Sequence, residues 1–99
     1  GLVLLAAYPA ENDSLAERAV PVLSIWASED GLANAEDRRE TADRLPDDAR
    51  VVVIEGGNHA GFGAYGPQDD DGEATIPREA QHERVRKEIL AFIERLARG

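Results

Sequence analysis

Three short apolar runs, separated by longer polar segments, predict the β-strands of this chain. They cover residues 2–7, 21–27 and 50–54. Residues 2–7 show none of the polar alternation of a half-exposed strand, so we expect that strand to be buried, although a short helical segment would give the same periodicity. Strands of this kind are typical of parallel sheets that are covered by helices.

The polar segments between and after these runs predict helices. Residues 14–17 read Ser-Leu-Ala-Glu, which fits a helix capping box, and Pro21 limits the helix that follows to a short one. Residues 34–45 have helical propensity, an acidic first turn and a shallow apolar stripe, which predicts a surface helix. Residues 75–97 predict the longest helix, whose apolar residues fall on one face: Val85, Ile89, Phe92, Ile93 and Leu96.

The alternation of strands and helices predicts an α/β fold with a parallel sheet. A parallel sheet of three strands is rarely a whole domain, because its open apolar edge invites pairing with another strand. The sequence also begins inside a predicted strand and contains no methionine. We therefore expect residues 1–99 to form a single partial domain whose N-terminal half lies upstream.

Charge and composition narrow the classes of partner. The 99 residues include 20 Asp and Glu against 11 Lys and Arg, a net charge of −9, which disfavours nucleic acid and anionic membrane surfaces. No apolar run approaches the ~20 residues of a membrane helix, and no basic signal-peptide region precedes residues 2–7. A cytoplasmic location is the default expectation. The absence of cysteine excludes disulfides, thiolate nucleophiles and thiolate zinc sites.

Two loops carry the candidate chemistry. Asp30 follows the second predicted strand, and His59 follows the third in a glycine-rich segment, residues 56–68. In a parallel sheet both loops leave from the same edge, where a histidine can act as general base and an acid can orient its ring. Each residue also has a simpler interpretation. Asp30 can bond its own backbone in a tight turn, and His59 can be a surface or structural residue.

These segments resemble a known family. Residues 21–31, PVLSIWASEDG, and residues 53–68, VIEGGNHAGFGAYGPQ, are similar to the C-terminal part of an α/β-hydrolase of the bacterial branch related to dienelactone hydrolase. The resemblance covers nearly the whole chain. It implies that Asp30 and His59 follow the seventh and eighth strands of that fold, in the family's order of acid before histidine. It also implies a serine-dependent hydrolase of small-molecule esters or similar acyl compounds that needs no cofactor.

The family's nucleophile is missing from these residues. No Gly-x-Ser-x-Gly motif occurs, and the upstream backbone donors of an oxyanion hole are absent too. Ser14, Ser24 and Ser28 do not stand in a strand-to-helix elbow. We therefore expect the serine to lie upstream of Gly1. The alternative is a non-catalytic, truncated hydrolase-like module that covers its open sheet edge by pairing with another chain. That chain can be a different protein or a second copy of this one.

Two other motifs predict no site. Residues 61–66 fit Gly-x-Gly-x-x-Gly, but Pro67 and a polar segment follow where a nucleotide-binding helix would begin. The acidic residues at 69–71 and 73 do not match the spacing of a calcium-binding EF-hand loop, and we expect a solvated acidic loop. We accordingly expect neither a metal nor a cofactor. His82 is expected to face solvent on the last helix.

Overall fold

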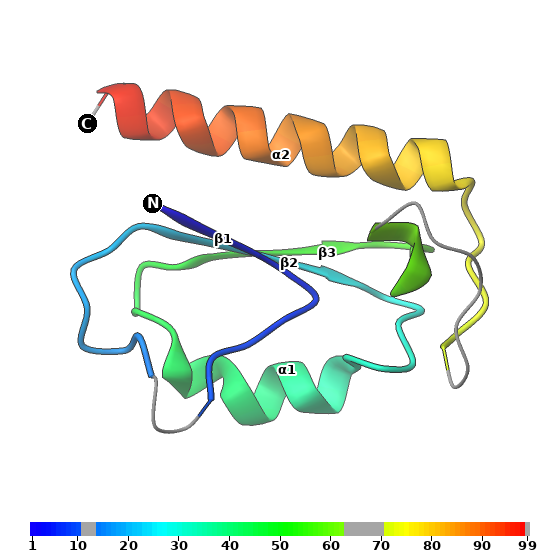
Figure 1. Cartoon of the computed structure of the whole chain (residues 1–99), viewed down its shortest axis with the longest axis horizontal. Coiled ribbons are helices and arrows are strands. Elements are labelled where there is room, and N and C mark those ends of the chain that lie inside the picture. The colour runs from blue at the N-terminus through cyan, green and yellow to red at the C-terminus, as the bar shows by residue number, and fades with distance from the viewer. Residues whose placement is uncertain (11–13, 63–70, 99) are drawn as a thin grey trace.

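The fold is built on a three-stranded parallel sheet in the order β1–β2–β3 (Figure 1). The computed structural model describes residues 1–10, 14–62 and 71–98. The strands are β1 (Leu2–Leu5), β2 (Val22–Ala27) and β3 (Arg50–Ile54). The helices are α1 (Ala35–Thr41), its 3₁₀ continuation η2 (Ala42–Arg44), the short 3₁₀ helix η3 (Ala60–Phe62) and α2 (Arg78–Arg98). The parallel α/β architecture predicted from the sequence is confirmed.

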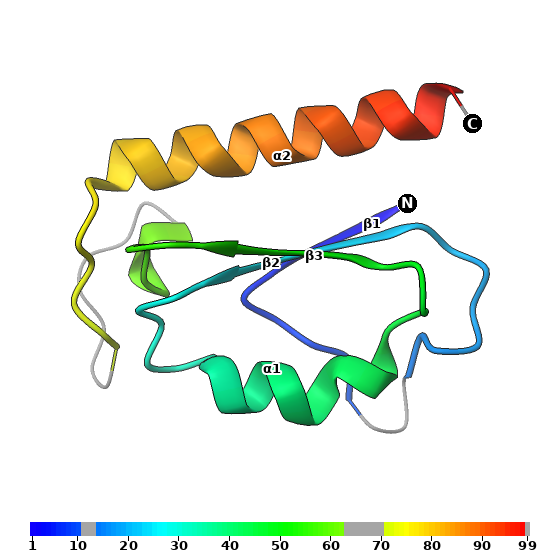
Figure 2. The ribbon, with the colours of Figure 1, turned by 180° about the vertical axis from the view of Figure 1, so that it is seen from behind.

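Helices cover the two faces of the sheet. Helix α2 lies along one face and α1 along the other, as the front and back views both show (Figures 1 and 2). All six residues of the central strand β2 are buried. The core on the α2 side joins β2 and β3 to this helix through Leu23, Ile25, Val52, Ile54 and Phe92. A smaller cluster on the other side contains Ala6, Trp26 and Ala33.

Helix α1 begins with a reciprocal cap at Asn34. The Asn34 side chain accepts the backbone N–H of Asp37 at 3.0 Å, and the Asp37 carboxylate accepts the backbone N–H of Asn34 at 3.1 Å. This reciprocal capping box satisfies two donors that a helix N-terminus otherwise leaves free. The predicted helix over residues 34–45 is therefore confirmed, with its last turn tightened into η2.

The short helix predicted after Ser14 is wrong. The Ser14 hydroxyl accepts the backbone N–H of Ala16 at 3.2 Å, and Arg18 donates to the Leu15 carbonyl at 3.0 Å, which forms a turn and no helix. The stretch before Pro21 is too short to recover the cost of helix nucleation, which fixes several residues for one hydrogen bond.

Strand β1 is shorter and more exposed than expected. It ends at Leu5 because Ala6 adopts a left-handed conformation with φ of 50°, although Ala6 still donates to the Ile25 carbonyl at 2.8 Å. Leu2 and Leu5 keep 37% and 38% of their surface exposed. The expectation of a fully buried strand is wrong here, because β1 lies at the edge of the described sheet.

Helix α2 begins at Arg78, three positions after the predicted start at residue 75. The backbone N–H groups of Thr75 and Ile76 are bonded to the Gly56 carbonyl at 2.8 and 3.3 Å, so they join the loop after β3. Of the predicted apolar face, Val85, Ile89 and Phe92 pack on the core, whereas Ile93 and Leu96 are exposed. No helix in the described part of the chain is both long enough and apolar enough to cross a membrane.

Candidate active site

The sheet brings the two candidate loops together. Ala27 is paired with Ile54 at the ends of β2 and β3, so both strands leave the sheet at the same level. Three further hydrogen bonds link the loops beyond the sheet: Ser28 N–H to the Ile54 carbonyl at 3.0 Å, Glu29 N–H to the Gly57 carbonyl at 2.8 Å, and Gly56 N–H to the Ser28 hydroxyl at 2.7 Å. The two loops thus form one rigid edge.

Asp30 uses its two carboxylate oxygens for two different purposes. Oδ1 accepts the backbone N–H groups of Leu32 at 2.8 Å and Ala33 at 2.7 Å, which is the turn that the simpler interpretation of this residue predicts. Oδ2 lies 2.9 Å from Nδ1 of His59. The Asp30 side chain is fully shielded from solvent. The turn therefore holds the carboxylate in place and aims its second oxygen at the imidazole.

The contact with Asp30 decides the tautomer of His59. An ionised carboxylate only accepts hydrogen bonds, so Nδ1 carries the proton and Nε2 keeps its lone pair in the neutral ring. A quarter of the His59 side chain is exposed, and within the described residues Nε2 has no hydrogen-bond partner. The ring is therefore oriented at one nitrogen and open to proton transfer at the other.

Gln81 of α2 holds the loop after β3 through two hydrogen bonds to the backbone of Asn58. It is 1% exposed, and its amide donates to the Asn58 carbonyl at 2.9 Å and accepts the Asn58 N–H at 3.2 Å. A Cβ atom at Gly57 would approach this amide to 2.8 Å, so a side chain there would displace Gln81. Sequence reasoning missed Gln81. Its signal was a polar residue four positions before Val85, on the apolar side of the helix.

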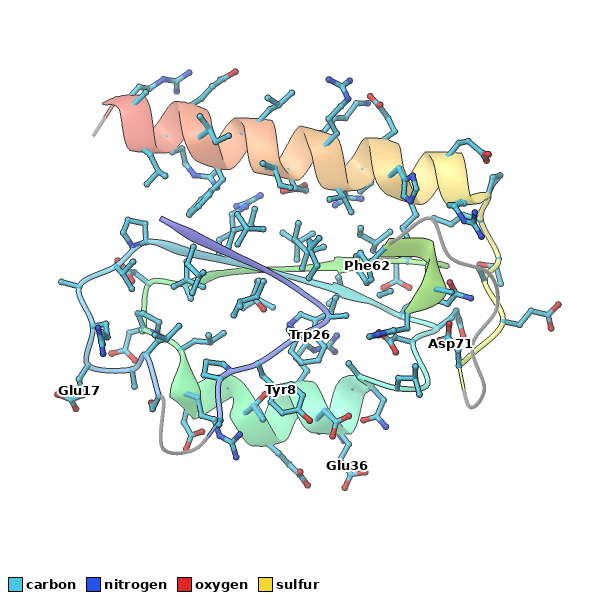
Figure 3. All side chains as sticks on the ribbon, in the orientation of Figure 1. Tyr8, Glu17, Trp26, Glu36, Phe62 and Asp71 are labelled. Carbon is cyan, nitrogen blue, oxygen red and sulfur yellow. The ribbon has the colours of Figure 1, made fainter. Side chains whose placement is uncertain are left out.

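Asp71 is the second residue that sequence reasoning missed: it keeps contact with solvent, but the prediction of a solvated acidic loop did not include its bonds to the backbone of both loops. Asp71 lies at the carboxyl end of the sheet (Figure 3). Its carboxylate accepts the backbone N–H groups of Gly31, His59, Ala60 and Gly72. Partial burial alone raises the pKa of Asp71, but these four N–H groups outweigh that effect and lower the pKa below its ordinary value of 3.8.

The structure also describes His82 and parts of the glycine-rich and acidic segments. His82 is exposed on α2, as predicted. Gly61 and Phe62 lie within η3, while residues 63–66 of the Gly-x-Gly-x-x-Gly match and the other two acidic residues of segment 69–71 fall outside the described residues. Among residues 1–10, 14–62 and 71–98, no group of three or more acidic or histidine side chains is placed to hold a metal ion.

The three serines of the chain have structural contacts. Ser24 is buried in β2 and accepts the Trp26 indole N–H at 2.8 Å, on the side of the sheet where Trp26 stacks against Tyr8 (Figure 3). Ser28 and Ser14 accept backbone N–H groups. Within the described residues none of them is hydrogen-bonded to His59. None occupies the sharp strand-to-helix turn of a nucleophile elbow either, because residues 29–34 separate Ser28 from α1.

A parallel α/β sheet in which an acid after one strand is hydrogen-bonded to a histidine after the next is typical of α/β-hydrolases. The comparison with protein families agrees, because the model of the alpha/beta hydrolase family matches residues 1–83, a span that contains Asp30 and His59. The chain therefore belongs to the alpha/beta hydrolase family. Comparisons with curated proteins and with solved structures gave no match.

Proposed function

We propose that residues 1–99 are the C-terminal part of a serine-dependent hydrolase of esters or similar acyl compounds, in the branch related to dienelactone hydrolase. In this proposal they form one partial domain that supplies Asp30 as orienting acid and His59 as general base. The observation that carries it is the 2.9 Å contact between Asp30 Oδ2 and His59 Nδ1, made by a carboxylate with no exposed surface.

The chemistry follows from the open ring nitrogen. Nε2 of His59 takes the proton of the serine hydroxyl while the serine oxygen bonds to the acyl carbon, and Asp30 stabilises the resulting imidazolium. When the ester C–O bond breaks, the imidazolium returns that proton to the leaving alkoxide. Water then gives a proton to Nε2 while its oxygen bonds to the acyl carbon. The bond between that carbon and the serine oxygen breaks, the imidazolium returns the proton to the serine oxygen, and the carboxylic acid is released. The serine and the oxyanion-hole donors come from a segment outside residues 1–99.

Two features support a partner segment of this kind. Within the described residues Ser14, Ser24 and Ser28 are not hydrogen-bonded to His59 and do not stand in a nucleophile elbow, which favours a nucleophile from outside residues 1–99. The edge strand β1 exposes Leu2 and Leu5, which is where a further parallel strand of the family's sheet would pair. The same exposed edge favours the second candidate function, a non-catalytic module that pairs through β1 with another chain.

The test compares two histidine variants of the complete protein that the source organism makes. We expect His59→Ala to lower the turnover of a short-chain p-nitrophenyl ester by at least about 10³-fold, because the general base is lost. His82→Ala is the matched control, since His82 is exposed on α2, and it should keep normal turnover. Normal turnover in the His59 variant would contradict the proposal. No esterase activity in the unaltered protein, with β1-dependent pairing to another chain, would favour the module.

A further inference from the structure

We propose that Asp71 is a positioning residue that holds His59 in hydrogen-bonding register with Asp30. This inference rests on the proposed function, because it assigns a role within the same pair. Asp71 lies 41 positions after Asp30 and 12 after His59 in the sequence (71 − 30 and 71 − 59), yet it contacts the loops of both.

One carboxylate spans the two loops. Oδ1 of Asp71 accepts the backbone N–H of Gly31, next to the orienting acid, at 3.2 Å, and the backbone N–H of His59 at 3.1 Å. Oδ2 accepts the backbone N–H of Ala60 at 2.9 Å. Because an ionised carboxylate has several acceptor sites and no donor, it suits three converging N–H groups better than an amide or hydroxyl would.

The residue after Asp71 shows that this segment is packed directly on the acid's turn. The backbone of Gly72 runs so close to Glu29 that a Cβ atom there would overlap the Glu29 carbonyl oxygen. The Gly72 carbonyl also accepts the side-chain N–H of Asn58 at 3.0 Å. Close backbone contact at Gly72 and a side-chain bond from Asn58 together place Asp71 between the loops, independently of its own hydrogen bonds.

The position of the His59 backbone determines the geometry of its ring. If Asp71 cannot accept the N–H groups of His59 and Ala60, those donors must find other partners, and the loop must shift. A shift of a fraction of an ångström would lengthen the 2.9 Å contact between His59 Nδ1 and Asp30. The lowered pKa of Asp71 agrees with a carboxylate that stays ionised in this role.

The experiment follows the His59 ring and turnover separately in the complete protein. ¹⁵N NMR of labelled histidine, assigned with His59→Ala, reports which ring nitrogen carries the proton. We expect Asp71→Asn to weaken the Nδ1–H signal of His59 and to lower kcat by about 10- to 100-fold with KM unchanged, because only the positioning of the base is altered. Asp71→Ala should have a larger effect.

Glu73→Gln is the control, since it removes one charge from the same segment at an exposed residue. Asn keeps the size of Asp71, so Asp71→Asn decides the matter if the alanine variant does not fold. A His59 signal and kcat like those of the unaltered protein in Asp71→Asn would overturn the inference, as would a lower Tm alone. An Asp71-dependent His59 signal without any esterase activity would uphold the positioning role and refute the proposed function.

Discussion

Replacing Asp30 by asparagine tests the contact between Asp30 and His59 at the residue that its surroundings hold most firmly. The side chain has no exposed surface, and its Oδ1 is held by the N–H groups of Leu32 and Ala33. An asparagine of the same size would keep its oxygen on these two donors, which turns its NH₂ group toward Nδ1 of His59. Two donors cannot share a hydrogen bond, so the ring must carry its proton on Nε2 instead. Nε2 can then no longer take a proton from serine.

The size of the effect follows from this reversal. A histidine held in the wrong tautomer costs a serine triad about 10⁴-fold in kcat, or about 5.5 kcal/mol of transition-state stabilisation at about 1.4 kcal/mol per factor of ten. The free energy of unfolding should fall by only about 1–3 kcal/mol, because the two turn hydrogen bonds of Asp30 persist. Activity should therefore be lost in a protein that remains folded.

The assay for Asp30→Asn measures kcat for a p-nitrophenyl ester and the ¹⁵N signals of His59 in the same complete protein. We expect the ring proton to move from Nδ1 to Nε2 while the rest of the spectrum stays dispersed. If kcat stays within about tenfold of the unaltered enzyme, which corresponds to about 1.4 kcal/mol, the reasoning fails. An Nδ1–H signal that survives the substitution would refute it as well.

The remaining predictions concern stability. Phe92 packs against the sheet and is 6% exposed, so Phe92→Ala should lower the free energy of unfolding, measured by urea titration, by about 3–5 kcal/mol. Ile93 is 53% exposed, so Ile93→Ala should lower it far less. Equal effects of the two substitutions would contradict the packing of α2. Because the pKa of Asp71 is lowered by folding, the stability that the unaltered protein has over Asp71→Asn should be complete above the ordinary value of 3.8 and should disappear as the pH falls through the lowered pKa. A difference that grows on acidification would show the sign to be wrong.

Local patterns in the sequence predicted the features that depend on local structure. The apolar runs predicted the three strands of the described residues, and the order of strands and loops placed Asp30 and His59 at one edge of the sheet. The short helix after Ser14 failed because a capping motif does not supply the length that a stable helix needs. The burial of β1 failed because an apolar composition does not tell whether a strand lies at an edge.

The supporting residues of the site depend on contacts between distant positions. Asp71 is hydrogen-bonded to Gly31, 40 positions away, and the surrounding acidic segment gave no sign that one carboxylate would accept backbone N–H groups from both loops. Gln81 contacts Asn58 across 23 positions. A polar residue on the apolar side of α2 was the available signal for Gln81, whereas Asp71 becomes recognisable only when its backbone partners are brought together by the fold.

Labelling with a serine-directed fluorophosphonate tests the central claim most directly. The complete protein and its His59→Ala variant are treated with the reagent, and the modified residue is located by peptide mass spectrometry. We predict one phosphonylated serine, distinct from Ser14, Ser24 and Ser28, whose labelling is lost in the His59 variant. Labelling that does not depend on His59, or that falls on one of these three serines, would contradict the assignment of Asp30 and His59 as the acid and base of a serine hydrolase.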